Sequence, residues 1–276
     1  MNQDAMLIEK YAQFRNVLAK SEPCQDFIPS DNDWHGLPES ITISSNVDIG
    51  RMVFRENLAA AAREFPISIN ELIETSRKLN AWAKVISTCG EDEKLVPIYE
   101  FVRPLCTFGL NLPYAIRERF YFAVAHLSHQ ANRVLMLADW QDDLPHDGKI
   151  GQRVAEKYAR EWPNWSELSD ALSQISDDDF KDRTKNFRNK YTHRNEFGIE
   201  LGISGGVLRN LGQVGGGVSY GFGGVAPITI DVAVKALDQQ CITSAAAYAS
   251  FQNLVVDQVR SLFAEESLDI AKYPET

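Results

Sequence analysis

The stretch from residue 180 to residue 194, FKDRTKNFRNKYTHR, decides how we expect this chain to fold and where its chemistry lies. Its aromatic residues recur at helical spacing, which predicts one amphipathic helix across the whole stretch. At about 100° per residue, Phe180, Phe187 and Tyr191 project into one narrow sector. This sector is the only one able to join a hydrophobic core, so we expect these three side chains to be buried.

Arg188, Asn189 and His193 project outside that aromatic sector, with Lys181 and Lys185 beside them. A guanidinium presents a planar fork of donors that suits phosphate oxygens. An imidazole can accept or donate a proton near neutral pH. The sequence therefore predicts an outward-facing polar surface that can grip a phosphate and transfer a proton without a metal ion.

The local charge of this stretch differs from that of the chain. Residues 181–194 contain six basic residues and one acidic residue, a net charge of +5, whereas the whole chain carries −10. Such a patch suits an anionic ligand. We expect RNA or phosphate to contact four of its basic residues, which are Lys181, Lys185, Lys190 and Arg194. The alternative is a solvated, charged helix balanced by the acidic run at residues 176–179.

The pattern Arg188-Asn189-x-x-x-His193 resembles the R-[polar]-x-x-x-H signature of the HEPN superfamily. The resemblance is specific at residues 187–194, and the order of the predicted helices supports it more loosely over residues 110–265. Many HEPN proteins are metal-independent endoribonucleases of toxin–antitoxin and other defence systems. Others bind RNA or nucleotide without cleaving it, or serve as scaffolds.

The resemblance implies a mechanism and an assembly. Catalytic members pair two copies of the signature across a dimer interface, so a homodimer is expected. His193 would act as general acid or base at the ribose 2′-OH or the leaving oxygen, and Arg188 would stabilise charge in the transition state. Asn189 would orient His193 or a phosphate oxygen, no cofactor would be needed, and the product would be a 2′,3′-cyclic phosphate. An antitoxin or another associated protein is a further expected partner.

The chain differs from one HEPN subgroup at a single position, and two alternative interpretations remain open. A toxin subgroup carries a modifiable tyrosine two residues after the histidine, and Asn195 stands at that position here. The first alternative is a non-catalytic helical module that binds RNA, nucleotide or an acidic partner. The second is an unrelated helical bundle in which the six-residue pattern is accidental.

The rest of the sequence predicts a mainly α-helical bundle. Helical spacing, caps and breakers favour helices at residues 4–20, 51–65, 68–88, 94–108, 114–138, 150–162, 165–175 and about 229–265. We expect the acidic run at residues 176–179 to cap the helix at 180–194, and a capping box of Ser68 and Glu71 to open the helix at 68–88. Gly109 should end the helix at 94–108, Pro113 should stand at the start of the next one, and Thr229 or Asp231 should cap the last helix. No linker is evident, so we expect a single domain over residues 1–276, in which a helical region at 1–109 packs on a HEPN-like bundle at 110–266.

A glycine-rich segment interrupts this helical pattern before the last helix. More than half of the 17 glycines lie between Gly202 and Gly224, with short apolar stretches among them. This pattern favours a small β-hairpin insertion at residues 200–228, and a floppy surface loop is the alternative.

Composition excludes several classes of protein. The chain has 276 residues, 44% hydrophobic and 24% charged, as ordinary globular proteins do. No apolar run approaches the roughly 18–20 residues that span a bilayer, and the N-terminus is too charged for a signal peptide. Four scattered cysteines suit reduced thiols in the cytoplasm. The pair His126 and His129 is a weak zinc signal that lacks a third ligand, so we expect no metal site. We assign the pair to helix packing or to a hydrogen bond with a neighbouring helix.

Overall fold

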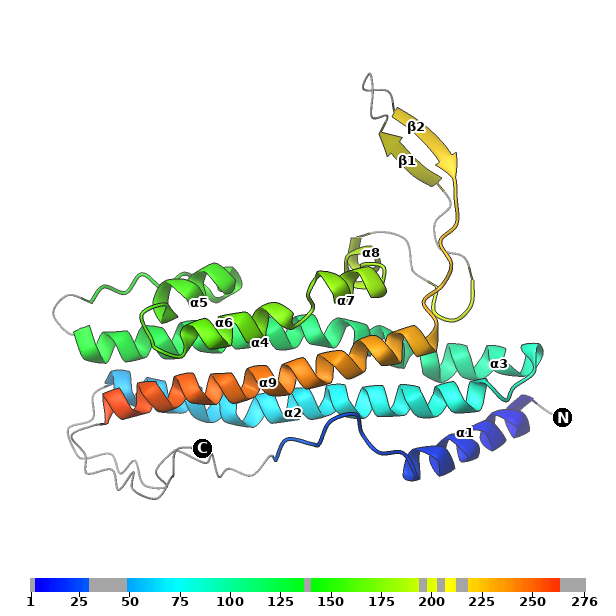
Figure 1. The fold of residues 1–276 in the computed structure, drawn as a ribbon, viewed down its shortest axis with the longest axis horizontal. Coiled ribbons are helices and arrows are strands. Elements are labelled where there is room, and N and C mark those ends of the chain that lie inside the picture. The colour runs from blue at the N-terminus through cyan, green and yellow to red at the C-terminus, as the bar shows by residue number, and fades with distance from the viewer. Residues whose placement is uncertain are drawn as a thin grey trace. The chain divides into compact units, whose positions relative to one another are not determined.

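The computed structural model describes residues 3–29, 49–136, 140–193, 198–202, 207–211 and 218–263. These residues are mainly helical, as predicted (Figure 1). Contacts divide the chain into two compact units, each assembled from three segments. The first unit takes residues 1–26, 72–112 and 176–240, and the second takes 27–71, 113–175 and 241–276. The expected single domain, with its 1–109 and 110–266 parts, stays a prediction.

Three long helices contribute residues to both units: α2 (Ile49–Ile86), α4 (Arg103–Met136) and α9 (Ile230–Leu262). The other elements of the first unit are α1 (Gln3–Ala19), α3 (Glu91–Pro97), the π-helix η1 (Ile98–Val102), α7 (Asp178–Arg183), α8 (Phe187–His193) and strands β1 (Val207–Leu211) and β2 (Val218–Phe222). The other elements of the second unit are the 3₁₀-helix η3 (Asp147–Lys149), α5 (Gln152–Ala159) and α6 (Trp165–Gln174).

An aromatic stack holds α1 in the core of the first unit. Phe14 stacks on Trp82 of α2 with ring centroids 4.5 Å apart, and Trp82 stacks on Phe101 of η1 at 5.0 Å. The nearly buried ammonium of Lys10 forms an ion pair with Glu93 of α3 at 3.2 Å. Stacked aromatic pairs add stability beyond the area that they bury, so these contacts help to hold α1 against α2 and η1.

Gly109 lies inside α4, and its predicted role as a helix end is wrong. A Cβ added to this glycine would meet Leu237 of α9 and Thr75 of α2, each at 2.9 Å. The glycine therefore permits a close approach of three helices within the first unit. The helix continues through Pro113, where we expected a new helix to begin.

The second unit is built around an aromatic cluster. Phe65 of α2 stacks on Phe120 of α4 with centroids 4.1 Å apart and meets Phe251 of α9 edge-on at 5.0 Å. This packing explains why α2 runs through Pro66, although the sequence predicted a break there. An internal proline costs about 3 kcal/mol, and each buried large apolar side chain contributes about 1.5–3 kcal/mol. The expected capping box at Ser68 is wrong, because its hydroxyl donates to the Glu64 carbonyl at 2.8 Å.

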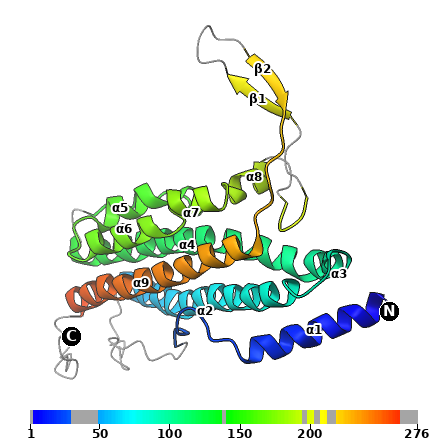
Figure 2. The ribbon, with the colours of Figure 1, turned by 45° about the vertical axis from the view of Figure 1, so that its right-hand side comes forward.

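Strands β1 and β2 form an antiparallel pair in which Val207 lies opposite Phe222 and Leu211 opposite Val218. The two strands lie side by side in both ribbon views (Figures 1 and 2). Residues 212–217, which would connect them, lie outside the described residues. The glycine-rich hairpin as a whole therefore stays a prediction.

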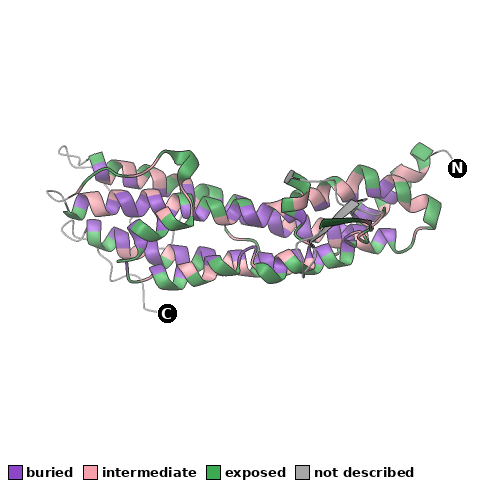
Figure 3. Cartoon of the chain, turned by 90° about the horizontal axis from the view of Figure 1, so that it is seen from above, coloured by how far each residue is buried: buried purple, intermediate pink, exposed green. Residues whose placement is uncertain are grey.

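The long helices are amphipathic, with buried residues on some faces and exposed residues on others (Figure 3). This pattern is what the helical spacing of apolar residues predicts. In the part of the chain that the structure describes, no helix combines the length and the apolar character needed to cross a membrane.

Candidate functional site

The helix predicted over residues 180–194 is two helices, α7 and α8, and the prediction of one continuous helix is wrong. The amide of Asn186 donates to the Lys181 carbonyl at 2.6 Å, and that of Lys185 donates to the Asp182 carbonyl at 3.0 Å. These two bonds form a Schellman motif, which ends α7. Lys185 and Asn186 both have φ of 54°, a left-handed conformation that usually belongs to glycine.

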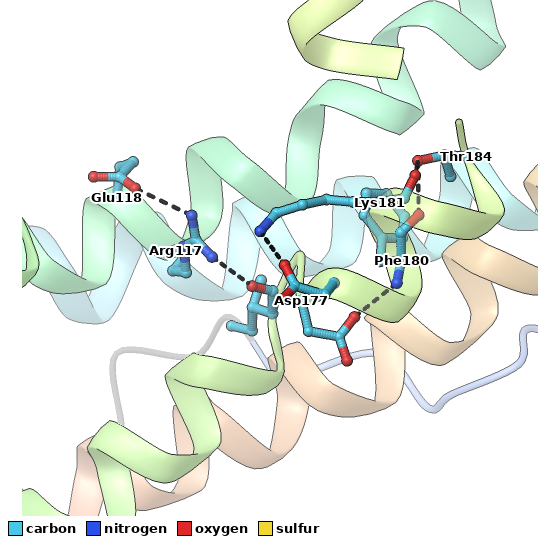
Figure 4. A network of polar contacts seen from close by, with 8 residues as sticks. Arg117, Glu118, Asp177, Phe180, Lys181 and Thr184 are labelled. Atoms are coloured by element: carbon cyan, nitrogen blue, oxygen red, sulfur yellow. Dashed lines mark hydrogen bonds and ion pairs between the residues drawn. The ribbon is translucent and has the colours of Figure 1, made fainter. Parts of the chain in front are cut away.

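The start of α7 is fixed by its own sequence. The Asp177 carboxylate accepts a hydrogen bond from the Phe180 amide at 2.8 Å, which satisfies one free donor of the first turn (Figure 4). Asp178 and Asp179 follow in the first turn, where carboxylates complement the helix dipole. The predicted capping by this acidic run is therefore confirmed.

Each of the two short helices is anchored by one phenylalanine. Phe180 is fully buried and Phe187 is 1% exposed, as the aromatic sector predicted. The prediction that Tyr191 is buried is wrong, because this residue is 48% exposed. Its ring stacks on that of Phe187, with centroids 5.5 Å apart and planes inclined by 14°. Phe187 and Tyr191 lie on the same face of α8, four residues apart, but only Phe187 is buried in the core.

The motif residues lie on α8. Arg188 and Asn189 are exposed, as expected for a polar outward-facing surface. His193 is the last residue of α8. The side chain of His193 and the whole of Arg194 lie outside the described residues. The catalytic roles of Arg188, Asn189 and His193 stay predictions.

Much of the basic charge around α7 is engaged by carboxylates of the same helix. Lys181 forms an ion pair with Asp178 at 2.7 Å, and Arg183 forms one with Asp179. Residues 177–194 contain six basic and four acidic residues, so six minus four leaves a net charge of only +2. The alternative of a balanced, solvated helix therefore describes α7 well.

Lys185 joins the turn between α7 and α8 to the segment that precedes α9. Its ammonium donates to the carbonyl oxygens of Ala226 at 2.7 Å and Pro227 at 3.2 Å. This long-range contact accompanies the left-handed conformation of Lys185, which the sequence pattern did not indicate. A phosphate would compete with these two carbonyls for the ammonium. The predicted phosphate contacts of Lys181, Lys185 and Lys190 are not tested by this geometry.

The ends of the predicted insertion meet at a short β-bridge. Ile199 pairs with Ile228, and both side chains are buried. The Glu200 carboxylate then accepts a hydrogen bond from the Ile230 amide at 2.8 Å, at the start of α9. Of the two predicted caps, Thr229 and Asp231, Thr229 is confirmed, since its hydroxyl accepts a hydrogen bond from the Val232 amide at 3.3 Å.

A polar cluster around His129, in the second unit, shows what the two histidines do. The ring of His129 is almost fully buried, and its Nε2 lies 3.4 Å from the Asp142 carboxylate. It lies edge-on to the Tyr158 ring, with centroids 5.0 Å apart. His126 lies one turn away, with its Nε2 3.7 Å from Asp147. Burial lowers the pKa of both imidazoles below the ordinary value, which favours their neutral forms.

The same cluster includes the carboxylate of Asp143. It accepts a hydrogen bond from the Tyr158 hydroxyl at 2.5 Å and forms an ion pair with Lys157. These partners, Lys157 first, lower the pKa of Asp143. The cluster attaches the loop before α5 to α4 and α5, which agrees with the expected packing role of the histidines. The sequence did not indicate the contact of Asp143 with Lys157, because fourteen residues separate them.

The cysteines carry no sign of nucleophilic chemistry. All four are free thiols, and Cys106 and Cys241 are buried. Burial raises the pKa of Cys106 to about 12, so this thiol stays protonated at neutral pH. Among the described residues, no three His, Cys, Asp or Glu side chains form a group that could hold a metal ion.

The site is thus a short exposed helix with an arginine, an asparagine and a terminal histidine, next to a charge-balanced helix. Comparisons of the chain with models of protein families, with curated proteins and with solved structures found no match.

Proposed function

We propose that this chain is a HEPN-like protein that cleaves RNA without a metal ion, at a composite site formed by two copies of the chain. One observation carries the proposal. Arg188 and Asn189 are exposed on α8, the helix that ends at His193, so the RNxxxH pattern lies on a single surface helix. The described structure is mainly helical, which agrees with a HEPN-like bundle whose glycine-rich hairpin spans residues 200–228.

Helix geometry supports a site made by two copies. His193 follows Arg188 by five positions in the sequence. At about 100° and 1.5 Å per residue, their positions on the helix are roughly 140° apart in rotation and 7.5 Å apart along the axis. Two groups so disposed do not converge on one phosphate from a single helix. A second copy of α8 would bring the arginine of one chain toward the histidine of the other.

The proposed reaction transfers two protons, forms one phosphorus–oxygen bond and breaks another. His193 takes the proton of the ribose 2′-OH, and the 2′ oxygen attacks the phosphorus. The bond from phosphorus to the 5′ oxygen breaks, and a second proton is delivered to that oxygen by the imidazolium of one of the two copies. Arg188 stabilises the negative charge on the phosphate oxygens through its planar donors. Asn189 orients the imidazole or a phosphate oxygen, and the product is a 2′,3′-cyclic phosphate.

Further RNA contacts in the proposal come from Lys181, Lys185, Lys190 and Arg194. Lys181 and Lys185 would first exchange their present partners for phosphate oxygens. The proposed protein acts in the cytoplasm, where free thiols such as its four cysteines are kept reduced. In a toxin–antitoxin or other defence role, its partner would be an antitoxin or another associated protein.

A second candidate function is a non-catalytic module that uses α8 to bind RNA, nucleotide or an acidic partner. The internal ion pairs of α7 favour it, because they leave few basic groups to follow a long RNA backbone. A small anionic ligand needs fewer cations than an RNA strand does.

The test incubates the purified protein with mixed RNA in EDTA, and compares the wild type with Arg188→Ala and His193→Ala. We expect the wild type to produce fragments with cyclic phosphate ends. Each substitution should reduce cleavage at least about 100-fold, because each removes a group that acts in the transition state.

Matched controls exist in the second unit. Arg153 and His146 are an exposed arginine and an exposed histidine remote in sequence from α8, so Arg153→Ala and His146→Ala should cleave like the wild type. Cleavage that survives Arg188→Ala and His193→Ala would contradict the proposal. RNA binding without any cleavage would favour the second candidate.

A further inference from the structure

Tyr191 is an aromatic residue placed where a soluble helix normally carries a polar one. Its side chain is 48% exposed, although its ring is held against that of Phe187, which is 1% exposed. The two rings are nearly parallel, inclined by 14°, with centroids 5.5 Å apart. Phe187 thus fixes the Tyr191 ring from one side, while the rest of the ring remains accessible.

We propose that Tyr191 binds an unpaired nucleobase of single-stranded RNA by stacking, next to the phosphate that Arg188 holds. This inference rests on the proposed function, and it adds a base-binding residue to the proposed catalytic trio. The ligand it names is RNA with unstacked bases, because a base inside a duplex has no free face to offer.

The distance along the helix suits such a pair of contacts. Tyr191 follows Arg188 by three residues, so both project from neighbouring positions, with Cβ atoms about 5–6 Å apart. A base and its own phosphate can therefore contact both side chains at once. His193 is only two residues beyond Tyr191, a spacing at which helical side chains do not face each other. Tyr191 consequently positions substrate and has no part in proton transfer.

The surroundings of Tyr191 favour a base over an apolar protein partner. Among the described side chains of α8, the other exposed ones are Arg188, Asn189 and Thr192, and all three are polar. A hydrophobic interface would need a contiguous apolar patch. A single ring amid polar and basic groups instead resembles the stacking platforms of proteins that bind single-stranded nucleic acid.

Fixing the ring in advance strengthens the inference. A surface tyrosine that moved freely would lose side-chain freedom on binding, which weakens affinity. The stack on Phe187 has already restricted this ring. Stacking of a base on an aromatic ring contributes about 1–3 kcal/mol, which corresponds to roughly 5- to 150-fold in affinity.

The experiment measures binding of fluorescein-labelled dodecamer RNAs by fluorescence anisotropy in EDTA. The protein carries His193→Ala throughout, so that RNA is not consumed. One RNA has all its bases and the other is abasic. We expect the protein with Tyr191 intact to bind the complete RNA at least about 5-fold more tightly than the abasic RNA. Tyr191→Ala should remove that preference, and Tyr191→Phe should keep it.

A matched control is Tyr220 of β2, which is 69% exposed and lies outside α8. Tyr220→Ala should bind both RNAs as the parent does. The inference is overturned if Tyr191→Ala keeps the preference for bases while Arg188→Ala weakens binding, an outcome that leaves the proposed function standing. It is also overturned if Tyr191→Ala turns a dimer into a monomer in light scattering, which would assign the ring to the interface. A wild-type protein that neither binds nor cleaves RNA would end both proposals.

Discussion

Helices α7 and α8 are neighbours of nearly equal length, but only α7 contains acidic residues that form ion pairs with its bases. In α7, the acids lie three and four residues before the bases, so Lys181 and Arg183 form ion pairs with Asp178 and Asp179. In α8 no acid is present, and Arg188 is exposed beside Asn189. Spacing within the helix therefore accounts for the ion pairs of α7, whereas α8 contains no acidic residue that could pair with its bases at helical spacing.

The net charge of the basic patch depends on whether the acids that precede α7 are included. A count over residues 181–194 omits the three acids at residues 177–179 and gives +5, whereas residues 177–194 give +2. Total charge is thus a poor guide to a binding surface. The better guide is whether each base has an acid at helical spacing on its own helix.

Both helices are anchored by a buried phenylalanine, and removing either ring should have the largest effect on stability. Phe180→Ala and Phe187→Ala should each lower the free energy of unfolding by about 3–5 kcal/mol, because each removes a fully buried ring and leaves a cavity. Tyr191→Ala should cost far less, because half of that residue is exposed. Urea unfolding followed by circular dichroism measures all three. A loss below about 1 kcal/mol for Phe187→Ala would show that the ring does not anchor α8.

RNA cleavage should depend on the arginine of α8 and hardly at all on the arginine of α7. Arg188→Ala should reduce RNA cleavage at least about 100-fold, because a transition-state contact is lost. Arg183→Ala removes the same type of side chain from α7, where the guanidinium pairs with Asp179, and should change the rate less than about 3-fold. Initial rates on one RNA substrate in EDTA measure both. Equal losses in the two variants would abolish the distinction drawn between α7 and α8.

The smallest effect concerns the ion pair of Asp178 in α7. A hydrogen bond from Lys181 lowers the pKa of Asp178 below its ordinary value of 3.8. A carboxylate with a lowered pKa stabilises the fold above the unfolded-state pKa, and this contribution disappears as the pH falls through the folded-state value. The contribution is small because the pair is exposed to solvent.

An NMR titration of the Asp178 carboxyl measures this shift. In Lys181→Ala the pKa should return toward the ordinary value, because the donor is absent. In Arg188→Ala, which alters the neighbouring helix, the pKa of Asp178 should not move. A shift of equal size in both variants would show that α7 does not balance its own charges.

The sequence predicted much of the local structure correctly. Helical spacing gave the mainly helical character of the chain, and capping residues gave the starts of α7 and α9 at Asp177 and Thr229. Aromatic spacing gave the burial of Phe180 and Phe187. These features depend on residues a few positions apart, so a single sequence contains the information.

The incorrect predictions share a different origin. Pro66 and Gly109 read as helix ends, yet α2 and α4 continue through them, because partners distant in sequence pack there. Gly109, for example, makes room for Leu237 of α9. The polar cluster of Asp143, Lys157 and Tyr158 was missed for the same reason.

From the sequence alone, Arg188, Asn189 and His193 were placed on one helix, and Phe180 and Phe187 were assigned to the core. The residue at which α8 begins follows instead from the turn at Lys185 and from its long-range contacts. Lys185 adopts a left-handed conformation while its ammonium binds the carbonyls of Ala226 and Pro227, some forty residues away. Local helix propensity cannot anticipate such a contact, because the groups that stabilise the turn come from a distant part of the chain.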